Sequence, residues 1–398
     1  MRRVFVGGTV VAPDGSASVA DVLVDGDRIV DVGSGLDGEE SVDVSGKHLL
    51  PGLFDSHIHV AFNHIDMWRH VQTPLSYSFY QAIGNLEATL RSGITTVRDA
   101  GGADLGMKHA VRDGLIAGPR MQISINMISQ TGGHGDKTHP SGMHIGFRLF
   151  YPGSPPAIVD GPQEMRRKVR ELIREGADVL KVATSGGVLS PRDEPTHAHF
   201  QMDELEMLVL EAAAADRWVM AHAQANTGIK NAIRAGIRSI EHGIYLDDEA
   251  IEMMLERGTW LVPTLRAPSG VKRAAEAGVR IPDEAIRKAE EVAEIHQESF
   301  RRAVDADVKI AMGTDSPVTP HGENLLELVE MQKGGMTPGE VLHAATASAA
   351  ELMGVEAELG SIEPGKLADL VVVDGDPLDF TSLRERIEQV WKAGDRVA

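Results

Sequence analysis

The chain has 398 residues, no cysteine and a formal net charge of -20. The lack of cysteine excludes disulfides and a thiol nucleophile. The negative charge disfavours nucleic acid and anionic membranes, so we expect a small-molecule substrate and no such partner, with a homo-oligomer left open. Residues 1–8 lack the apolar stretch of a signal peptide, and no apolar run could span a bilayer, which predicts a cytoplasmic protein.

Both ends of the chain show short alternating strands separated by glycine-rich turns. Such a pattern is typical of small antiparallel sheets. The predicted strands are Val4–Val6, Thr9–Val11, Val22–Val24, Ile29–Val32, Leu370–Asp374 and Gln389–Ala393. Because an isolated ribbon is only marginally stable, we expect the two ends, residues 1–48 and 356–398, to form one small β-sandwich.

The centre of the chain alternates apolar runs with segments of helical periodicity, such as Glu164–Glu175 and Leu246–Arg257. This alternation indicates an α/β fold with a parallel sheet covered by helices. The runs that we interpret as strands are Leu49–Asp55, Thr95–Asp99, Met121–Ile125, Val179–Ala183, Trp218–His222, Ser239–His242, Trp260–Thr264 and Lys309–Gly313. Eight strands predict a (β/α)8 TIM-like barrel over residues 49–355.

Histidines and one aspartate follow several of these runs. His57 and His59 are two residues apart, so their side chains project to the same face of a strand and can bind one ion together. His222, His242 and Asp315 each come where an apolar run turns polar. Catalytic residues of a barrel collect at these strand ends, which predicts a metal site there.

Lys181 lies inside the apolar run Val179–Ala183, where a lone ammonium is costly to bury. Something must compensate it, either a salt bridge to a carboxylate or a chemical change of the amine. Each metal candidate also has a structural alternative, such as a core histidine or, for Asp315, a helix cap. Six such residues in barrel order favour the metal site.

Several motifs together resemble one known family over nearly the whole chain. They are Pro51-Gly52-Leu53-Phe54-Asp55-Ser56-His57-Ile58-His59, Lys181, His222, Glu241-His242-Gly243, Gly313-Thr314-Asp315 and Gly365-Lys366-Leu367-Ala368-Asp369-Leu370. This set is similar to the amidohydrolase superfamily. Two more motifs narrow the resemblance to the branch of the Xaa-Pro and Xaa-Arg dipeptidases: Gln130-Thr131-Gly132-Gly133-His134-Gly135-Asp136 and Lys181-Val182-Ala183-Thr184-Ser185-Gly186-Gly187.

The resemblance implies a site for two divalent metal ions, most simply Zn²⁺. Asp315 would join the two histidines of the first strand on one ion, and His222 and His242 would hold the second. Lys181, carboxylated by CO₂, would bridge both ions. An N-carboxylated lysine is an anion with two oxygens, so it also removes the cost of a buried ammonium. Imidazole and carboxylate are normal zinc ligands.

The same resemblance implies roles in catalysis and substrate binding. Asp315 would carry the proton from the attacking hydroxide to the leaving nitrogen, and His134 would hold the substrate carbonyl or its oxyanion. We expect Tyr77 in an aromatic wall and the protein backbone at Gly186 in close approach to the substrate. Dipeptidase relatives often carry Tyr or His after the histidine of strand five. This chain has Ala223-Gln224, and Gln224 can both donate and accept hydrogen bonds.

The predicted activity is cleavage of a peptide-like C–N bond by a metal-bridging hydroxide, in a dipeptidase or an N-acyl amino acid hydrolase. A hydrolase of xenobiotic amides, ureas or carbamates is an alternative, as are an imidazolonepropionase-like enzyme for cyclic amides and a mononuclear deaminase. The alternative outside the enzymes is a metal-free binding protein on the same scaffold, which would be expected to lose ligands. None of the six predicted ligands is missing.

Overall fold

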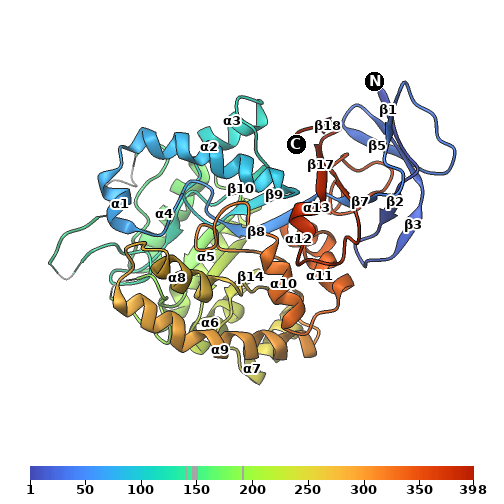
Figure 1. Cartoon of the computed structure of the whole chain (residues 1–398). Helices are drawn as coiled ribbons and strands as arrows, with labels where there is room; N and C mark the ends of the chain where they lie inside the picture. Colours follow the sequence, from blue (N-terminus) through green and yellow to red (C-terminus); the bar gives the residue numbers. More distant parts are fainter. Residues whose placement is uncertain (140, 146–150, 191) are drawn as a thin grey trace.

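The computed structural model describes residues 1–139, 141–145, 151–190 and 192–398. The loop 131–162, which carries His134, therefore lies only partly within the described residues. Figure 1 shows a large body of helices around central strands, and beside it a smaller β region that holds both chain termini. The helices of the described part of the chain are all too short or too polar to cross a membrane.

The smaller region consists of two sheets. The first has the strand order β5-β4-β1-β6 and the second β18-β17-β16-β7-β2-β3. Their bounds are β1 Arg2–Val6, β2 Thr9–Val11, β3 Ala17–Val19, β4 Asp21–Asp25, β5 Arg28–Gly33, β6 Glu40–Asp43, β7 His48–Pro51, β16 Leu370–Val373, β17 Ile387–Lys392 and β18 Asp395–Arg396. The six predicted strands coincide with β1, β2, β4, β5, β16 and β17; β3, β6 and β18 were not predicted.

The two ends of the chain share this region. Strand β7 pairs antiparallel with β16, with Leu50 opposite Val371, and parallel with β2. Buried side chains from both sheets form one core cluster, in which the rings of Phe5 and Trp391 meet edge to face with centroids 4.9 Å apart. The ends of the sequence therefore stabilise each other, as expected for strands that are too short to fold alone.

The large body contains two parallel sheets, with the strand orders β10-β9-β8 and β11-β12-β13-β14-β15. Their bounds are β8 Leu53–Ile58, β9 Ile94–Asp99, β10 Arg120–Ile123, β11 Met127–Ile128, β12 Leu180–Ala183, β13 Val219–Ala223, β14 Ser239–His242 and β15 Trp260–Val262. These strands are almost wholly buried, as expected for parallel strands covered by helices.

Two predicted strands need correction. Leu49–Asp55 is split at Gly52, so that its first half is β7 of the terminal sheet and its second half begins β8. A Cβ at Gly52 would lie 2.2 Å from Thr95 Oγ1, which explains the glycine at this close approach. Lys309–Gly313 is not a regular strand and has only an isolated bridge at Ile310.

The segment 309–313 nevertheless joins the edges of the two parallel sheets. Leu261 N donates to Lys309 O at 2.8 Å, and Ser56 N donates to Met312 O at 2.8 Å, so the segment lies between β15 and β8. Left-handed residues flank it, with φ 60° at Asp307 and 58° at Asp315. The segment therefore bridges the two sheets through backbone hydrogen bonds without being a regular strand itself.

Helices follow most of the parallel strands and surround them (Figure 1). The two predicted helices coincide with α4 and α7; α4 buries Met165, Val169 and Leu172, which repeat at helical spacing. The helices are α1 Met67–Gln72, α2 Leu75–Arg91, α3 Leu105–Arg112, α4 Pro162–Arg174, α5 Met202–Ala213, α6 Asn226–Ala235, α7 Asp248–Arg257, α8 Ala267–Glu276, α9 Asp283–Asp305, α10 Leu326–Lys333, α11 Pro338–Ala344, α12 Ala347–Met353 and α13 Leu383–Arg386.

Candidate metal centre and substrate cavity

The six predicted ligands meet at one end of the parallel strands, where they all line a single cavity of about 280 Å³. They come from β8, β12, β13 and β14 and from the segment after residue 313. These residues are His57, His59, Lys181, His222, His242 and Asp315. The fold thus brings imidazole, amine and carboxylate groups from distant segments of the chain together. They meet at the end of the parallel strands where active sites of α/β proteins commonly form.

Three of these side chains converge most closely. Single ligand atoms of His57, His59 and Asp315 all lie within 4.8 Å of one another. Asp315 Oδ1 is 3.4 Å from His57 Nε2 and 3.3 Å from His59 Nε2. Burial alone would raise the pKa of Asp315, but the two histidines lower it well below its usual value, so the carboxylate is ionised. Two imidazoles and one carboxylate are a donor set suited to zinc.

A buried carboxylate fixes the orientation of His57. The Nδ1 atom of His57 lies 2.7 Å from Glu241 Oε2, and Arg98 Nη2 donates to Glu241 Oε1 at 2.9 Å. Burial would raise the pKa of Glu241, but Arg98 and His57 lower it to about 2. The ionised Glu241 accepts a hydrogen bond from Nδ1–H, which leaves Nε2, on the side of Asp315, as the nitrogen that could bind a metal ion. Such a carboxylate behind a metal-ligating histidine sets its tautomer and raises its basicity.

Glu241→Gln is therefore expected to weaken zinc binding by about 10- to 100-fold, as is usual when a partner behind the ligands is lost. The substitution removes the charge that holds His57 and leaves Arg98 buried without a counterion. Competition with a fluorescent chelator measures the affinity. Glu351→Gln, which affects only the exposed pair with Lys309, is the matched control. Unchanged zinc affinity in a folded Glu241→Gln protein would contradict this role.

The other two histidines are also oriented as neutral ligands. His222 Nε2 lies 3.1 Å from Gly186 O and His242 Nδ1 lies 2.7 Å from Thr264 Oγ1, so each ring keeps its second nitrogen free. Their ring centroids are 4.7 Å apart. Burial, with Lys181 nearby, lowers the pKa of His222 to about 3, and burial lowers that of His242 well below its usual value. Neutral imidazole is the form that binds a metal.

Among the six predicted ligands, Lys181 stands out because its buried amine lacks a hydrogen-bond partner in the described part of the chain. Its side chain is 1% exposed, and within the described residues Nζ has no hydrogen-bond partner and forms no ion pair. The salt bridge considered from the sequence is therefore absent from that part of the chain. Burial lowers the pKa of Lys181 to about 8, although Glu241 and Asp315 oppose the shift. More of the amine is consequently neutral and nucleophilic near pH 7 than in an exposed lysine, although the ammonium still predominates.

Left-handed backbone marks two of the candidate ligands. The φ angle is 73° at His242 and 58° at Asp315, a region that costs non-glycine residues roughly 1–3 kcal/mol. Asp315 precedes no helix directly, since the next described one, α10, begins at Leu326. The helix-cap interpretation of Asp315 is thus not supported by the structure. Strain at such positions is common where geometry serves a site.

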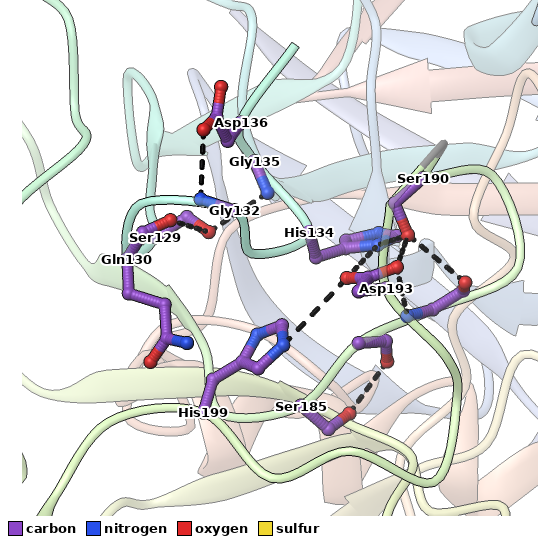
Figure 2. Close-up of polar contacts among 12 residues, drawn as sticks. Ser129, Gln130, Gly132, His134, Gly135, Asp136, Ser185, Ser190, Asp193 and His199 are labelled. Carbon is purple, nitrogen blue, oxygen red and sulfur yellow. Dashed lines mark hydrogen bonds and ion pairs between the residues drawn. The ribbon is translucent and has the colours of Figure 1, made fainter. Parts of the chain in front are cut away.

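His134 reaches the same site from the loop after β11. Its ring stacks on that of His222 with centroids 4.0 Å apart, and its Nδ1 lies 2.9 Å from Ser190 Oγ. Figure 2 shows Asp193 beside Ser190, with which it forms a hydrogen bond, and His199 on the other side of Asp193. This network fixes one ring nitrogen of His134 and leaves Nε2 for a ligand. Gly187 makes the stacking possible, because a Cβ there would lie 2.4 Å from the His134 ring.

The predicted substrate residues are not all in the cavity. Gln224 lines it, and its Oε1 is buried without a hydrogen-bond partner among the described residues. Tyr77, on α2, is 54% exposed and is not one of the lining residues. Gly186 does not line the cavity either; its N–H donates to His197 O, and its carbonyl faces His222. In the structure Gly186 therefore supports a ligand, whereas its contact with substrate stays a prediction.

Glu241, Arg98 and Ser190 were given no role from the sequence. Glu241 and Arg98 could have been found by the argument used for Lys181. Each is a charged residue within an apolar strand, and such a residue needs a partner when it is buried. Each is the partner of the other. Ser190 follows the Gly186-Gly187 pair in a loop, where no spacing rule indicates a contact with His134.

Comparison with known proteins agrees with this geometry. The amidohydrolase family model matches residues 48–397. The chain belongs to the amidohydrolase family. It is 37% identical to ochratoxinase of Aspergillus niger over 365 residues, which cover 87% of this chain and 75% of that protein.

Solved structures extend the similarity to the whole chain. A prolidase complexed with N-methylphosphonate-L-proline has a TM-score of 0.92 and 34% identity. A Xaa-Pro dipeptidase with bound methionine has a TM-score of 0.90 and 32% identity. Each match covers 100% of this chain and 99% of the other. The family member described here is thus a metal-dependent hydrolase of amide C–N bonds.

Proposed function

We propose that this amidohydrolase holds two divalent ions, most simply Zn²⁺, and cleaves the amide bond of a dipeptide or an N-acyl amino acid. The observation that carries the proposal is the convergence of five metal-type ligands and one unpartnered buried lysine on a single cavity. His57, His59 and Asp315 would hold one ion. His222 and His242, each with one free ring nitrogen, would hold the other.

Lys181 fits the bridging position as a carboxylated residue. Its Nζ is buried with no partner in the described structure, which is costly for an ammonium. Reaction of the neutral amine with CO₂ forms an N–C bond and releases a proton, and it leaves an anion with two oxygens. That anion would neutralise part of the charge of two cations. In a protein that binds no metal, the burial of Lys181 Nζ without a partner would have no compensating interaction.

The proposal includes the frame that supports the site. The two parallel sheets and the segment 309–313 between their edges support a closed (β/α)8 barrel over residues 49–355. The two terminal sheets with their shared core support a β-sandwich formed by residues 1–48 and 356–398. In this frame the ligands occupy the carboxyl ends of the barrel strands, and the terminal β-sandwich takes no part in the chemistry.

The reaction adds water across the amide. The bound ions would lower the pKa of water towards about 7 and polarise the scissile carbonyl. His134 would donate from Nε2 to the carbonyl oxygen as it gains negative charge, in the tautomer whose Nδ1 accepts from the Ser190 hydroxyl. Asp315 would accept the proton of the attacking group and deliver it to the leaving nitrogen. A C–O bond forms and the C–N bond breaks, which gives a carboxylate and an amine.

A second candidate substrate class is supported by the cavity wall. Apolar side chains such as Phe62, Phe79, Val188 and Val271 line much of the cavity. A hydrophobic wall with a few polar groups is typical of sites for small apolar ligands. Together with the similarity to ochratoxinase, this supports activity towards xenobiotic amides of similar size.

The experiment that tests the proposed function is hydrolysis of N-acyl amino acids and Xaa-Pro dipeptides by purified protein, followed by amine release. Activity should disappear after chelation and return with zinc and bicarbonate. A well-folded, zinc-loaded protein that hydrolyses neither class nor a xenobiotic amide would contradict the proposal. A cyclic imide and an aminopurine nucleoside in the same assay test the ring hydrolase and deaminase alternatives.

A further inference from the structure

One charged side chain of the cavity has no part in the chemistry above. Lys137 lies on the loop after β11, three residues beyond His134, and it lines the cavity. Its Nζ makes one hydrogen bond, to the backbone carbonyl of His134 at 3.3 Å, and forms no ion pair within the described residues. A single long contact leaves two of the three ammonium protons available to a ligand.

The surroundings of Lys137 make an unpaired ammonium unfavourable. Burial lowers its pKa, although Asp193 and Asp136 oppose the shift from beyond ion-pair distance. Lys137 is only half-buried, but an ammonium that is partly shielded from water and has no counterion is stabilised by a ligand of opposite charge. A carboxylate from the substrate would supply both an opposite charge and two hydrogen-bond acceptors.

The charges of the cavity lining are few. Among the lining residues that the structure describes, the lysines and arginines are Lys137 and Lys181, and the carboxylate is Asp315. Lys181 and Asp315 face the candidate metal centre. Lys137 is therefore the one cation in the described lining that is left for substrate. The described lining offers no second carboxylate that could pair with a substrate ammonium.

We propose that Lys137 binds the carboxylate of the substrate, and that the substrate is an N-acyl α-amino acid whose acyl group is uncharged. This inference rests on the proposed function, because it names the substrate of the same site. In such a molecule only the nitrogen and the α-carbon separate the carboxylate from the scissile carbonyl. In the fold, the ring of His134 stacks on His222 at the candidate metal centre, and the backbone carbonyl of His134 accepts from Lys137. The ammonium thus lies next to the residue that we assign to the scissile carbonyl.

The apolar wall completes the selection. Phe62, Phe79, Val188 and Val271 favour apolar groups on the substrate. A free dipeptide carries an α-ammonium next to the scissile carbonyl, and this charge would be buried without a counterion. The site thus selects substrates with one negative charge, on the side of the leaving amine.

A charge-removing substitution tests the carboxylate site. The variants are Lys137→Met, which keeps the chain length, and Lys137→Arg, which keeps the charge. The substrates are N-acetyl-L-phenylalanine and N-phenethylacetamide, which lacks only the carboxylate. Lys137→Met should lower kcat/KM for the acid by about 10- to 100-fold, mainly through KM, because the bond is made in the ground state as well. Its effect on N-phenethylacetamide should be under about twofold, and Lys137→Arg should recover part of the loss for the acid.

Equal losses on both compounds would show that Lys137 merely positions His134, and no loss on the acid would remove it from the site; either result overturns the proposal. The acyl side is tested with N-propionyl-L-phenylalanine against L-alanyl-L-phenylalanine, which adds only the ammonium. The neutral acyl compound should have at least about a tenfold higher kcat/KM, and a preference for the dipeptide would overturn that half.

Failure of the proposed function has a different signature. If wild-type protein cleaves none of these compounds, the hydrolase proposal fails and intact N-acetyl-L-phenylalanine becomes a stable ligand. Calorimetry then compares its Kd in wild type and in Lys137→Met. A Kd about 10- to 100-fold weaker in the variant supports the carboxylate site, whereas equal affinities or no binding to wild type overturn it.

Discussion

Asp315→Asn should lower kcat by at least about 10²- to 10⁴-fold, the contribution usual for general acid-base catalysis, while the protein stays folded. Asparagine keeps the size and one oxygen of the side chain, and it tolerates the left-handed backbone found here, with φ 58°. It cannot accept a proton in the way an ionised carboxylate does. In the structure His57 and His59 keep the pKa of Asp315 well below its usual value, against the effect of burial, so the base is ionised across the neutral range.

The control is an aspartate with a purely structural role. Asp247 caps helix α7 by accepting from Ala250 N at 2.8 Å, and asparagine is as good a cap. Asp247→Asn should therefore have near-normal turnover. Rates of Asp315→Asn and Asp247→Asn are compared with matched circular dichroism and metal content. Near-normal turnover by a well-folded Asp315→Asn enzyme with full metal would rule out proton transfer by Asp315.

Lys181→Ala should lose most metal and nearly all activity. A residue that bridges both ions should matter more than partners behind the ligands, whose loss costs about 10- to 100-fold in affinity or activity. The substitution also removes a buried amine without a partner, so the fold should not be weakened by a lost hydrogen bond. Metal content and kcat/KM are measured in the same preparations, with and without added acetate or propionate.

Recovery by a small carboxylate is the specific sign of the bridge. The carboxylate would occupy the space of the missing side chain and supply the two oxygens that we assign to the carboxylated lysine. Acetate should raise both metal content and rate in Lys181→Ala and have no such effect on wild type. A variant that keeps full metal and gains nothing from any short carboxylate would show that Lys181 is not a ligand.

The sequence predicted which six side chains converge on one cavity, but not the residues that surround and orient them. His57 and His59 follow from strand alternation, and Lys181 from the cost of a charge in an apolar run. Glu241, which holds His57, and its counterion Arg98 are 143 residues apart in the chain, so no local pattern pairs them. The structure brings them together because β8, β9 and β14 face a common interior.

The strand boundaries could also be predicted only in part from the sequence. Leu49–Asp55 is one continuous apolar run, and alternation alone gives no reason to break it at Gly52. The break follows from tertiary packing, because Thr95 and Asp369 occupy the space that a Cβ would need. Lys309–Gly313 has the composition of a strand, but in the structure it has only an isolated bridge and backbone hydrogen bonds to its two neighbours. Tyr77 was expected in an aromatic wall because it is one of several aromatic residues in the stretch after the first strand, whereas its position on α2 leaves it exposed.

The most direct test of the account is anomalous scattering at the zinc edge from crystals of protein prepared with zinc and bicarbonate. The account predicts two peaks per chain, roughly 3.5–4 Å apart as in other two-metal sites. One should contact His57, His59 and Asp315, the other His222 and His242, with density for a carboxyl group on Lys181 between them. A single peak, or an unmodified Lys181 that touches neither ion, would contradict it.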